Sequence, residues 1–400
     1  MPELQSLSAQ DKPLTGVVVL DFSQFLAGPV SAMRLSDLGA RVIKVERPGT
    51  GDIGRGLAFA GIEIDGDTLS FHVMNRGKES FAADLKQPND LAEILKLVEK
   101  ADVVIENFRP GVMQRLGLSY ETLSAINPRL IYLSITGYGP EGAWSKRPGQ
   151  DLLAQSMSGL PNLNGSSDDP PIAVGIALAD IITSIHAAHG VTAALYRREK
   201  TGKGARIETS LMESMLDLQF ELLSAHLTDP SVTVKRGVPH TAHPFLQAPY
   251  GIYKTSNGNI AIAMTSVPEL GRLVGLESLE EYEDPATWWS EQSAITNQLA
   301  NHLTSNSTEH WLELLDAADV WCAPVLELPQ LVEHDGFKEL SVVQPMTRIS
   351  EEDGKVIEIK TTRSPIRIDG KALRVSKGAP RIGEHTQLIR NEFLKEQSNA

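Results

Sequence analysis

Apolar and polar residues follow a regular block pattern in the first part of the chain. Residues 16–22 form a near-continuous apolar run, typical of a strand buried on both faces, and residues 29–38 have helical spacing that ends at Gly39. A second apolar strand pattern follows at residues 41–45. A strand, a helix and a strand joined this closely predict a parallel βαβ unit.

The same alternation continues to about residue 209. Further strands are predicted at residues 79–85, 103–107, 130–135 and 205–209, and further helices at residues 90–101, 119–126, 151–159 and 180–198. Strands that alternate with helices indicate an α/β fold with an open parallel sheet.

The pattern changes after a helical stretch at residues 211–227. Residues 228–249 contain four prolines and indicate an irregular linker, residues 250–264 predict a hairpin around Asn257 and Gly258, and residues 341–368 return to strand character. The predicted organisation is therefore a large domain beginning with residues 1–227, a linker at 228–249, a small domain at 250–330, and a C-terminal return to the large domain at 331–400.

Composition narrows the class of protein. Apolar residues make up 41% of the 400 residues, which is ample for a packed core. The 37 basic and 51 acidic residues give a net charge of −14, which argues against nucleic acid or an anionic membrane as a partner. No signal-peptide pattern or apolar run of about 20 residues is evident, and the single cysteine, Cys322, excludes an intramolecular disulfide. We therefore expect a cytoplasmic protein.

Common cofactor motifs are missing. The segment after the first strand has one glycine, Gly28, where a dinucleotide fingerprint needs three, and no GxxxxGK[ST] loop is present. The histidine pairs His186/His189 and His240/His243 have no HExxH motif or third ligand beside them, so we expect no metal site. A GxSxG nucleophile motif is also absent.

Basic residues follow several predicted strands. Arg47, Lys86 and Arg109 each come after a strand, and Arg115 lies shortly beyond Arg109. Taken singly, each is best explained as a solvated loop charge. The carboxyl ends of parallel strands meet at one sheet edge, where open α/β sheets bind ligands. Four cations there, in a chain of net negative charge, indicate a polyanionic ligand such as a phosphate compound.

Asp180 lies where the apolar run at residues 172–178 gives way to a helix. Aspartate is a good N-cap residue, worth about 1 kcal/mol, and this is one interpretation. The other is a nucleophile, because a helix amino end favours the ionised carboxylate. The two roles are compatible, and spacing alone leaves them about equally favoured.

Longer motifs add a family resemblance. The chain resembles the family III (CaiB/BaiF) CoA-transferases, which include formyl-CoA:oxalate and carnitine CoA-transferases and α-methylacyl-CoA racemases. The resemblance covers nearly the whole chain and is carried by residues 14–22 with Gly28 and Pro29, then by residues 38–49, 75–78, 107–111, 126–131, 154–159 and 198–204.

The resemblance implies an acyl-CoA:carboxylate CoA-transferase with Asp180 as its nucleophile. The implied intermediates are an aspartyl mixed anhydride and an aspartyl-CoA thioester, the substrates are an acyl-CoA and a small carboxylic acid, and no tightly bound cofactor is expected. The implied CoA-binding residues are Arg47, Lys86 and Arg115 near the nucleotide and phosphates, Asn107, Phe108 and Arg109 along the same cleft, and Leu26 and Ala27 beside the thioester.

Two departures from the family pattern bear on the substrate. Gln150 stands where the racemases carry a histidine, which favours transfer over racemisation, and the adjacent Asp151 is given a supporting role. The glycine-rich loop of formyl-CoA transferases is missing from residues 239–249. The alternatives are a racemase or epimerase of the same fold, a non-catalytic CoA-binding protein in which Asp180 only caps its helix and, last, a nicotinamide dehydrogenase.

The resemblance also implies an architecture. It predicts a large Rossmann-like domain built from both chain ends, a smaller α+β domain, and an interlocked homodimer.

Overall fold

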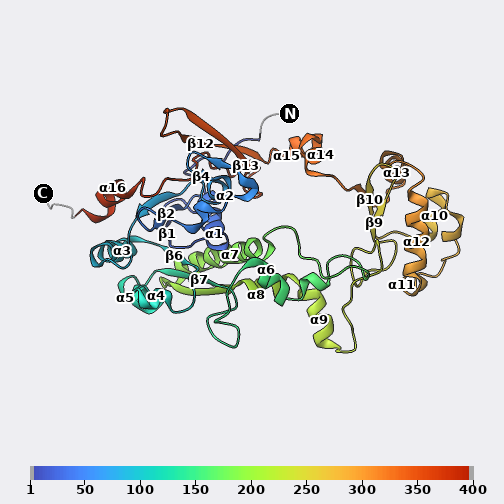
Figure 1. The fold of residues 1–400 in the computed structure, drawn as a ribbon, viewed down its shortest axis with the longest axis horizontal. Coiled ribbons are helices and arrows are strands. Elements are labelled where there is room, and N and C mark those ends of the chain that lie inside the picture. The colour runs from blue at the N-terminus through green and yellow to red at the C-terminus, as the bar shows by residue number, and fades with distance from the viewer. Residues whose placement is uncertain (1–3, 396–400) are drawn as a thin grey trace. The chain divides into compact units, whose positions relative to one another are not determined.

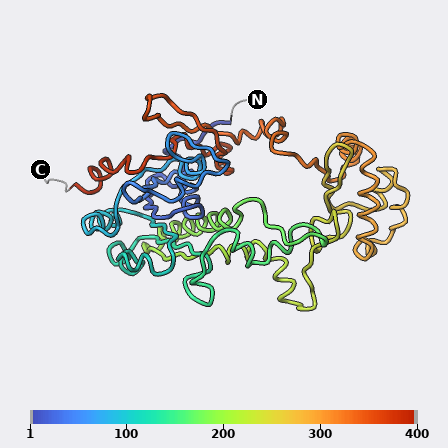
Figure 2. The backbone as a smooth tube through the Cα atoms, viewed as in Figure 1, coloured from blue at the N-terminus to red at the C-terminus, as the bar shows by residue number. Residues whose placement is uncertain are grey.

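The computed structural model describes residues 4–395, which divide into two units (Figure 1). The first unit contains Ala177–Leu218 together with the described residues of Met1–Ala154 and Gly336–Ala400, and the second contains Gln155–Ile176 and Gln219–Asp335. The blue N-terminal and red C-terminal segments of Figure 2 both belong to the first unit. Residues 155–176 precede the predicted linker in sequence but group with the second unit.

A six-stranded parallel sheet forms the centre of the first unit, in the order β5-β2-β1-β6-β7-β8. The predicted α/β fold with a parallel sheet is therefore confirmed. Its strands are β1 (Val18–Asp21), β2 (Arg41–Glu46), β5 (Glu79–Ala82), β6 (Val103–Glu106), β7 (Ile131–Thr136) and β8 (Ala205–Ser210).

Helices cover both faces of this sheet. Apolar side chains of α3 (Pro88–Lys100) and α5 (Tyr120–Ile126) share one buried cluster with Leu20 of β1 and Ile43 of β2. The helix α1 (Ala27–Asp37) contributes nothing to that cluster and contacts β1, β2 and β6, while α7 (Leu178–Thr201) contacts α1, β7 and β8. Because both faces are covered, the strands are the near-continuous apolar runs seen in the sequence.

The other helices of this part of the chain are short. They are α2 (Leu69–Met74), α4 (Val112–Arg115), α6 (Asp151–Met157) and α8 (Leu211–Leu218). The helix predicted at residues 211–227 is interrupted at Gln219, where α8 ends and α9 (Phe220–Thr228) follows. Helix α7 is long and apolar enough to cross a membrane by length and composition alone, but the core helix of a soluble protein meets the same test.

The C-terminal segment adds strands to the first unit. Its paired strands are β12 (Val343–Ile349) with β13 (Val356–Thr362) and β14 (Arg367–Ile368) with β15 (Lys371–Ala372), and a further short pair is β3 (Glu63–Ile64) with β4 (Asp67–Thr68). Arg348 of β12 is buried and forms an ion pair with Asp67 at 2.7 Å. The helix α16 (Thr386–Ile389), which a π-helical turn at Arg390–Leu394 follows, packs beside β5, so the C-terminal segment folds with the N-terminal part of the chain.

The second unit has its own core around a three-stranded antiparallel sheet. Its strands are β9 (Gly251–Lys254), β10 (Asn259–Ile262) and β11 (Cys322–Pro324), and its helices after α9 are α10 (Val267–Val274), α11 (Thr287–Ser290), α12 (Gln292–Leu303), α13 (Thr308–Asp316) and α14 (Leu328–Glu333), with α15 (Asp335–Leu340) following at the boundary. The predicted hairpin is confirmed, because β9 and β10 pair around Asn257 and Gly258. Tyr253 and Trp311 are buried in this core.

Candidate active site

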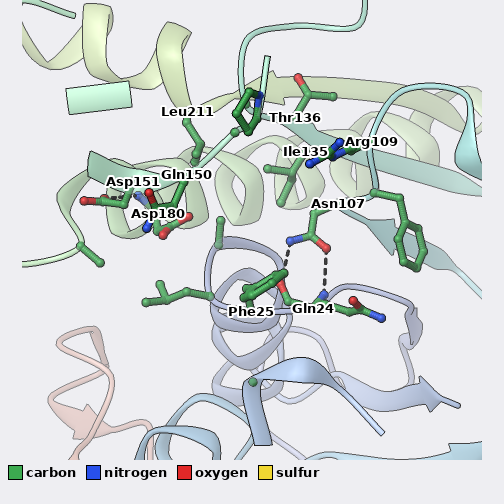
Figure 3. Close-up of a pocket in the computed structure, with 18 of the residues that line it drawn as sticks. Gln24, Phe25, Asn107, Arg109, Ile135, Thr136, Gln150, Asp151, Asp180 and Leu211 are labelled. Carbon is green, nitrogen blue, oxygen red and sulfur yellow. Dashed lines mark hydrogen bonds between the residues drawn. The ribbon is translucent and has the colours of Figure 1, made fainter. Parts of the chain in front are cut away.

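A cavity of about 680 Å³ opens at the carboxyl end of the parallel strands in the first unit. The loops that follow β1, β6 and β7 form its walls, together with the first turn of α7 (Figure 3). This is the edge of an open α/β sheet where ligands are expected. Asp180 lines the cavity with Gln150 and Asp151.

Asp180 lies inside the first turn of α7 and does not cap it. The helix begins at Leu178 after the N-cap residue Ala177, which makes no side-chain capping bond. The backbone N–H groups of Ala179 and Asp180 donate instead to Oδ1 of Asp151, at 2.7 and 3.2 Å. The cap interpretation of Asp180 is therefore wrong. The capping carboxylate comes from Asp151 on α6, which leaves the carboxylate of Asp180 available to the cavity.

The environment of Asp180 disfavours its charge. Burial and the nearby negative charge of Asp151 raise the pKa of Asp180 to about 7. Within the described residues 4–395, no hydrogen bond or ion pair reaches its carboxylate. The expectation that the helix start keeps this group readily ionised is thus opposed by burial and by a like charge. Once ionised, the carboxylate is partly desolvated, which makes it a stronger nucleophile than one in water.

A glycine pair brings Gln150 and Asp151 to this position. The backbones of Gly137, after β7, and Gly149, before α6, touch, and a Cβ added to Gly137 would lie 2.4 Å from the Cα of Gly149. Only glycine permits this approach. The intervening loop is closed at its base, so the start of α6 meets the start of α7. The two glycines were visible in the sequence, but their contact was not.

The opposite wall is the loop between β1 and α1, residues 22–26, hereafter the β1–α1 loop. The side-chain amide of Asn107 clamps its backbone: Gln24 N donates to Asn107 Oδ1 at 2.8 Å, and Asn107 Nδ2 donates to Gln24 O at 2.7 Å (Figure 3). Phe25 has the left-handed backbone angle φ 65°, which is rare for a bulky residue. Asn107 therefore holds the loop that carries Leu26 to the cavity.

The predicted CoA-binding residues separate into two groups. Those that line the cavity with Asp180 are Leu26, Ala27, Asn107, Phe108 and Arg109. Arg47, Lys86 and Arg115 are exposed and are not among its lining residues. Figure 3 shows Arg109 and Asp180 apart from each other, so one predicted cation, itself exposed, lines the cavity with the carboxylate, and the other three do not.

Sequence reasoning missed several lining residues. They are Gln24, Phe25, Gly54, Leu57, Phe59, Met74, Thr136, Ser145, Arg147 and Leu211. Gln24 and Phe25 directly precede the predicted Leu26, so proximity to a matched motif was the available signal. Leu57 and Phe59 carried no signal, because they lie in a loop without a regular hydrophobic pattern.

The histidines and acidic residues do not assemble into a metal site. Within residues 4–395, no group of three histidine, cysteine, aspartate or glutamate side chains is placed to hold an ion. His186 instead contacts Ser214 Oγ at 3.0 Å and Asp217 at 3.1 Å.

Comparison with known proteins points to one family. The sequence profile described as CoA-transferase family III matches residues 14–386. The chain is 33% identical over 392 residues to the succinate–glutarate CoA-transferase of Agrobacterium fabrum, covering 95% of this chain and 96% of that protein. It is 32% identical over 389 residues to the acetyl-CoA:oxalate CoA-transferase of Acetobacter aceti, with 95% and 96% coverage.

A solved structure gives the same result. A CaiB/BaiF family protein from Brucella suis superposes with a TM-score of 0.82 at 33% identity, covering 96% of this chain and 99% of that one.

Proposed function

Because this chain belongs to CoA-transferase family III and is an acyl-CoA:carboxylate CoA-transferase, we propose that Asp180 is the nucleophile that carries CoA from one acid to another. The observation that supports this role is a partly desolvated carboxylate at the wall of a cavity, with its pKa raised to about 7 and its helix capped by a different residue. A carboxylate whose oxygens cap a helix or form an ion pair would be a poorer nucleophile.

In the proposed first half-reaction, an Asp180 oxygen attacks the thioester carbonyl of the donor acyl-CoA. The C–S bond breaks, which yields a mixed anhydride on Asp180 and free CoA thiolate. The thiolate then attacks the Asp180 carbonyl of the anhydride. This attack releases the donor acid as a carboxylate and leaves an aspartyl-CoA thioester.

The second half-reaction runs the same steps with the acceptor. The acceptor carboxylate attacks the aspartyl-CoA thioester, which gives a new mixed anhydride and CoA thiolate. Attack of the thiolate on the acceptor acyl carbon forms the product thioester and returns Asp180 as a carboxylate. No net proton or electron is exchanged. Water must be kept away from both intermediates, and the apolar side chains of Phe25, Leu26 and Leu211 around the cavity suit that requirement.

The acceptor is proposed to be a short dicarboxylic acid. The similar proteins described above are named for succinate, glutarate and oxalate, and Arg109 and Arg147 line this cavity. A guanidinium binds a carboxylate through charged hydrogen bonds. The proposal therefore assigns one carboxylate of the acid to transfer and the other to recognition by a cation.

We further propose the assembly and location that the sequence and the resemblance imply: an interlocked homodimer in the cytoplasm, built from a Rossmann-like domain of both chain ends and a smaller α+β domain. Apolar side chains that are exposed in the single chain, including Phe220 and Leu227 of α9, are consistent with a partner subunit. Light scattering coupled to gel filtration measures the subunit number, and a monomer at micromolar concentration would contradict the homodimer.

An isotope experiment tests the nucleophile. When the acceptor acid carries ¹⁸O in its carboxylate, the proposed steps transfer one labelled oxygen to Asp180 in each turnover. Mass spectrometry of the peptide that contains Asp180 should detect it. Asp180→Ala should lower transfer by about 10⁴-fold or more while the variant remains folded. Asp217→Asn, which changes an exposed carboxylate on α8, is the matched control with near-normal activity. Retained turnover in folded Asp180→Ala would refute the proposal.

A further inference from the structure

We propose that the buried ion pair between Lys44 and Asp52 is a positioning device that fixes the β1–α1 loop and holds Phe25 in the wall of the catalytic cavity. This inference rests on the proposed transferase chemistry of the same cavity. Asp52 and Lys44 are positioning residues, because they act through the loop and do not line the cavity themselves.

The loop has an unfavourable conformation that its own side chains do not explain. Phe25 has φ 65°, a left-handed angle at which a bulky side chain crowds the backbone. The residue is 48% exposed, so burial does not compensate for that angle. Residues held in such conformations persist only where the surroundings determine them, and they are concentrated at functional sites.

The ion pair forms hydrogen bonds with the backbone of the β1–α1 loop, and these bonds hold the loop in its conformation. Phe25 N donates to Asp52 Oδ1 at 3.2 Å, and Gly54 N donates to the same oxygen at 2.8 Å. Lys44 Nζ donates to Ser23 O at 2.8 Å and lies 2.8 Å from Asp52 Oδ2. The pair therefore contacts the loop on both sides of Gln24, whose own backbone is clamped by Asn107.

The burial of this pair supports a role beyond stability. Lys44 and Asp52 are almost fully buried. Taking two charges out of water is costly, and a buried pair is often no more stabilising than well-packed apolar residues. What an apolar pair could not supply is an acceptor for Phe25 N and a donor to Ser23 O. These two bonds determine the path of the backbone that leads into Leu26 and Ala27 at the cavity.

The consequence for catalysis follows from geometry. Reacting atoms must be held within a few tenths of an ångström, and a displacement of about 1 Å in a positioning element can cost about 100-fold in rate. If the β1–α1 loop relaxes, the cavity wall facing the acyl-CoA moves, while the exposed cations remain in place. We therefore expect loss of the pair to lower kcat more than it raises KM for the acyl-CoA.

A double-mutant cycle with Phe25 provides the test. Asp52→Ala should lower kcat about 10- to 100-fold and change KM less than about 3-fold. Phe25→Gly removes the side chain that disfavours the left-handed angle, so Asp52→Ala should cost less than about 3-fold further in that background. Asp52→Asn keeps Oδ1 as an acceptor and should retain more kcat than Asp52→Ala. An equal loss of kcat from Asp52→Ala in both backgrounds would overturn the proposal.

A matched control separates positioning from stability. Asp37 and Arg76 form another buried ion pair, at 2.8 Å, with no hydrogen bond to the β1–α1 loop. Asp37→Asn should lower the thermal midpoint comparably and leave kcat of the folded enzyme near its normal value. An equal loss of kcat in Asp37→Asn would show a purely structural role for both pairs.

Hydrogen exchange tests the positioning independently of the chemistry. Amides in a peptide covering residues 22–28 should exchange faster in Asp52→Ala than in the unmodified protein, and Asp37→Asn should leave them unchanged. Unchanged exchange in Asp52→Ala would refute the positioning role even if transfer were active. Absence of any CoA transfer by the unmodified protein would contradict the proposed function instead, so the two failures are distinguishable.

Discussion

Two groups of carboxylates in the first unit, one buried and one partly buried, have opposite electrostatic surroundings. Beneath the β1–α1 loop lies a support cluster, defined as Asp21, Lys44, Asp52 and Lys78, in which each carboxylate faces a cation. At the start of α7 lies a carboxylate pair, Asp180 and Asp151, in which one acid faces another. In both places burial disfavours the charged form of the acid. The charge of the neighbouring group decides whether the pKa of the acid is raised or lowered.

In the support cluster the partner overcomes burial. Lys78 Nζ lies 2.7 Å from Asp21 Oδ2, and both side chains are fully buried. Burial opposes ionisation of Asp21, but the charges of Lys78 and Lys44 outweigh it and lower the pKa of Asp21 below its ordinary value. Lys78 also donates to Pro29 O and Asn75 Oδ1, so the cluster is fully hydrogen-bonded at this lysine. Such carboxylates are fixed and unreactive.

In the carboxylate pair the partner adds to the effect of burial. One oxygen of Asp151 caps α7, and the charge of Asp151 raises the pKa of Asp180 further. A buried acid that faces a cation supports the fold, whereas a partly buried acid beside another acid is available for chemistry. Perturbed carboxylates of the second kind are candidates for functional sites on physical grounds.

The largest expected effect on stability comes from breaking the support cluster. Lys78→Met leaves the Asp21 charge buried without its main partner, so we expect the free energy of unfolding to fall by about 3–5 kcal/mol. Urea unfolding monitored by circular dichroism measures it. Lys96→Met, at an exposed lysine of α3, should change stability by less than about 0.5 kcal/mol. Adding Asp21→Asn to Lys78→Met should recover part of the lost free energy of unfolding. An unchanged free energy of unfolding in Lys78→Met would contradict the supporting role of this ion pair.

The next effect has the opposite sign. The folded-state pKa of Asp180 lies above its ordinary value of 3.8, so the ionised group costs stability, and this cost grows as pH rises from about 4 through about 7. Asp180→Asn should therefore match the unmodified protein near pH 4 and exceed it at pH 8 by about 1–3 kcal/mol. A pKa rise from 3.8 to about 7 corresponds to a stability cost of roughly 4 kcal/mol. The expected difference is smaller because Asp180 is partly exposed to solvent. Thermal unfolding at both pH values checks this, and a less stable variant at pH 8 would contradict it.

The smallest effect concerns pH dependence. Since the Asp151 charge raises the pKa of Asp180, kcat/KM should rise with pH through about 7, and Asp151→Asn should move that rise to lower pH by about half a unit to one unit. Asparagine keeps an oxygen that can cap α7. A pH–rate profile of both proteins measures the shift, with Asp217→Asn as a control whose profile stays unchanged. An unmoved profile in Asp151→Asn would show that the like charge does not act on Asp180.

The sequence by itself determined the six strands of the parallel sheet and the position of Asp180 near the start of a helix. Apolar runs separated by helical spacing predicted β1, β2, β5, β6, β7 and β8, because hydrophobic periodicity is a local property of the chain. It also placed Asp180 at a helix start within two residues, since α7 begins at Leu178. Long motifs identified the family, which the comparisons bear out. The strands, the helix start and the family motifs all depend on residues that lie close together in the sequence.

Only the tertiary structure decided what each charged group does. Asp21 and Lys78 are 57 positions apart, and Asp151 caps a helix whose first turn lies 28 residues away. Phe25 N donates to Asp52 Oδ1, 27 residues further along. No local pattern encodes these contacts, because burial and partner charge arise only when distant segments pack together. For that reason spacing alone left Asp180 balanced between cap and nucleophile, although the family resemblance favoured the nucleophile, and the folded structure shows that Asp151 provides the cap.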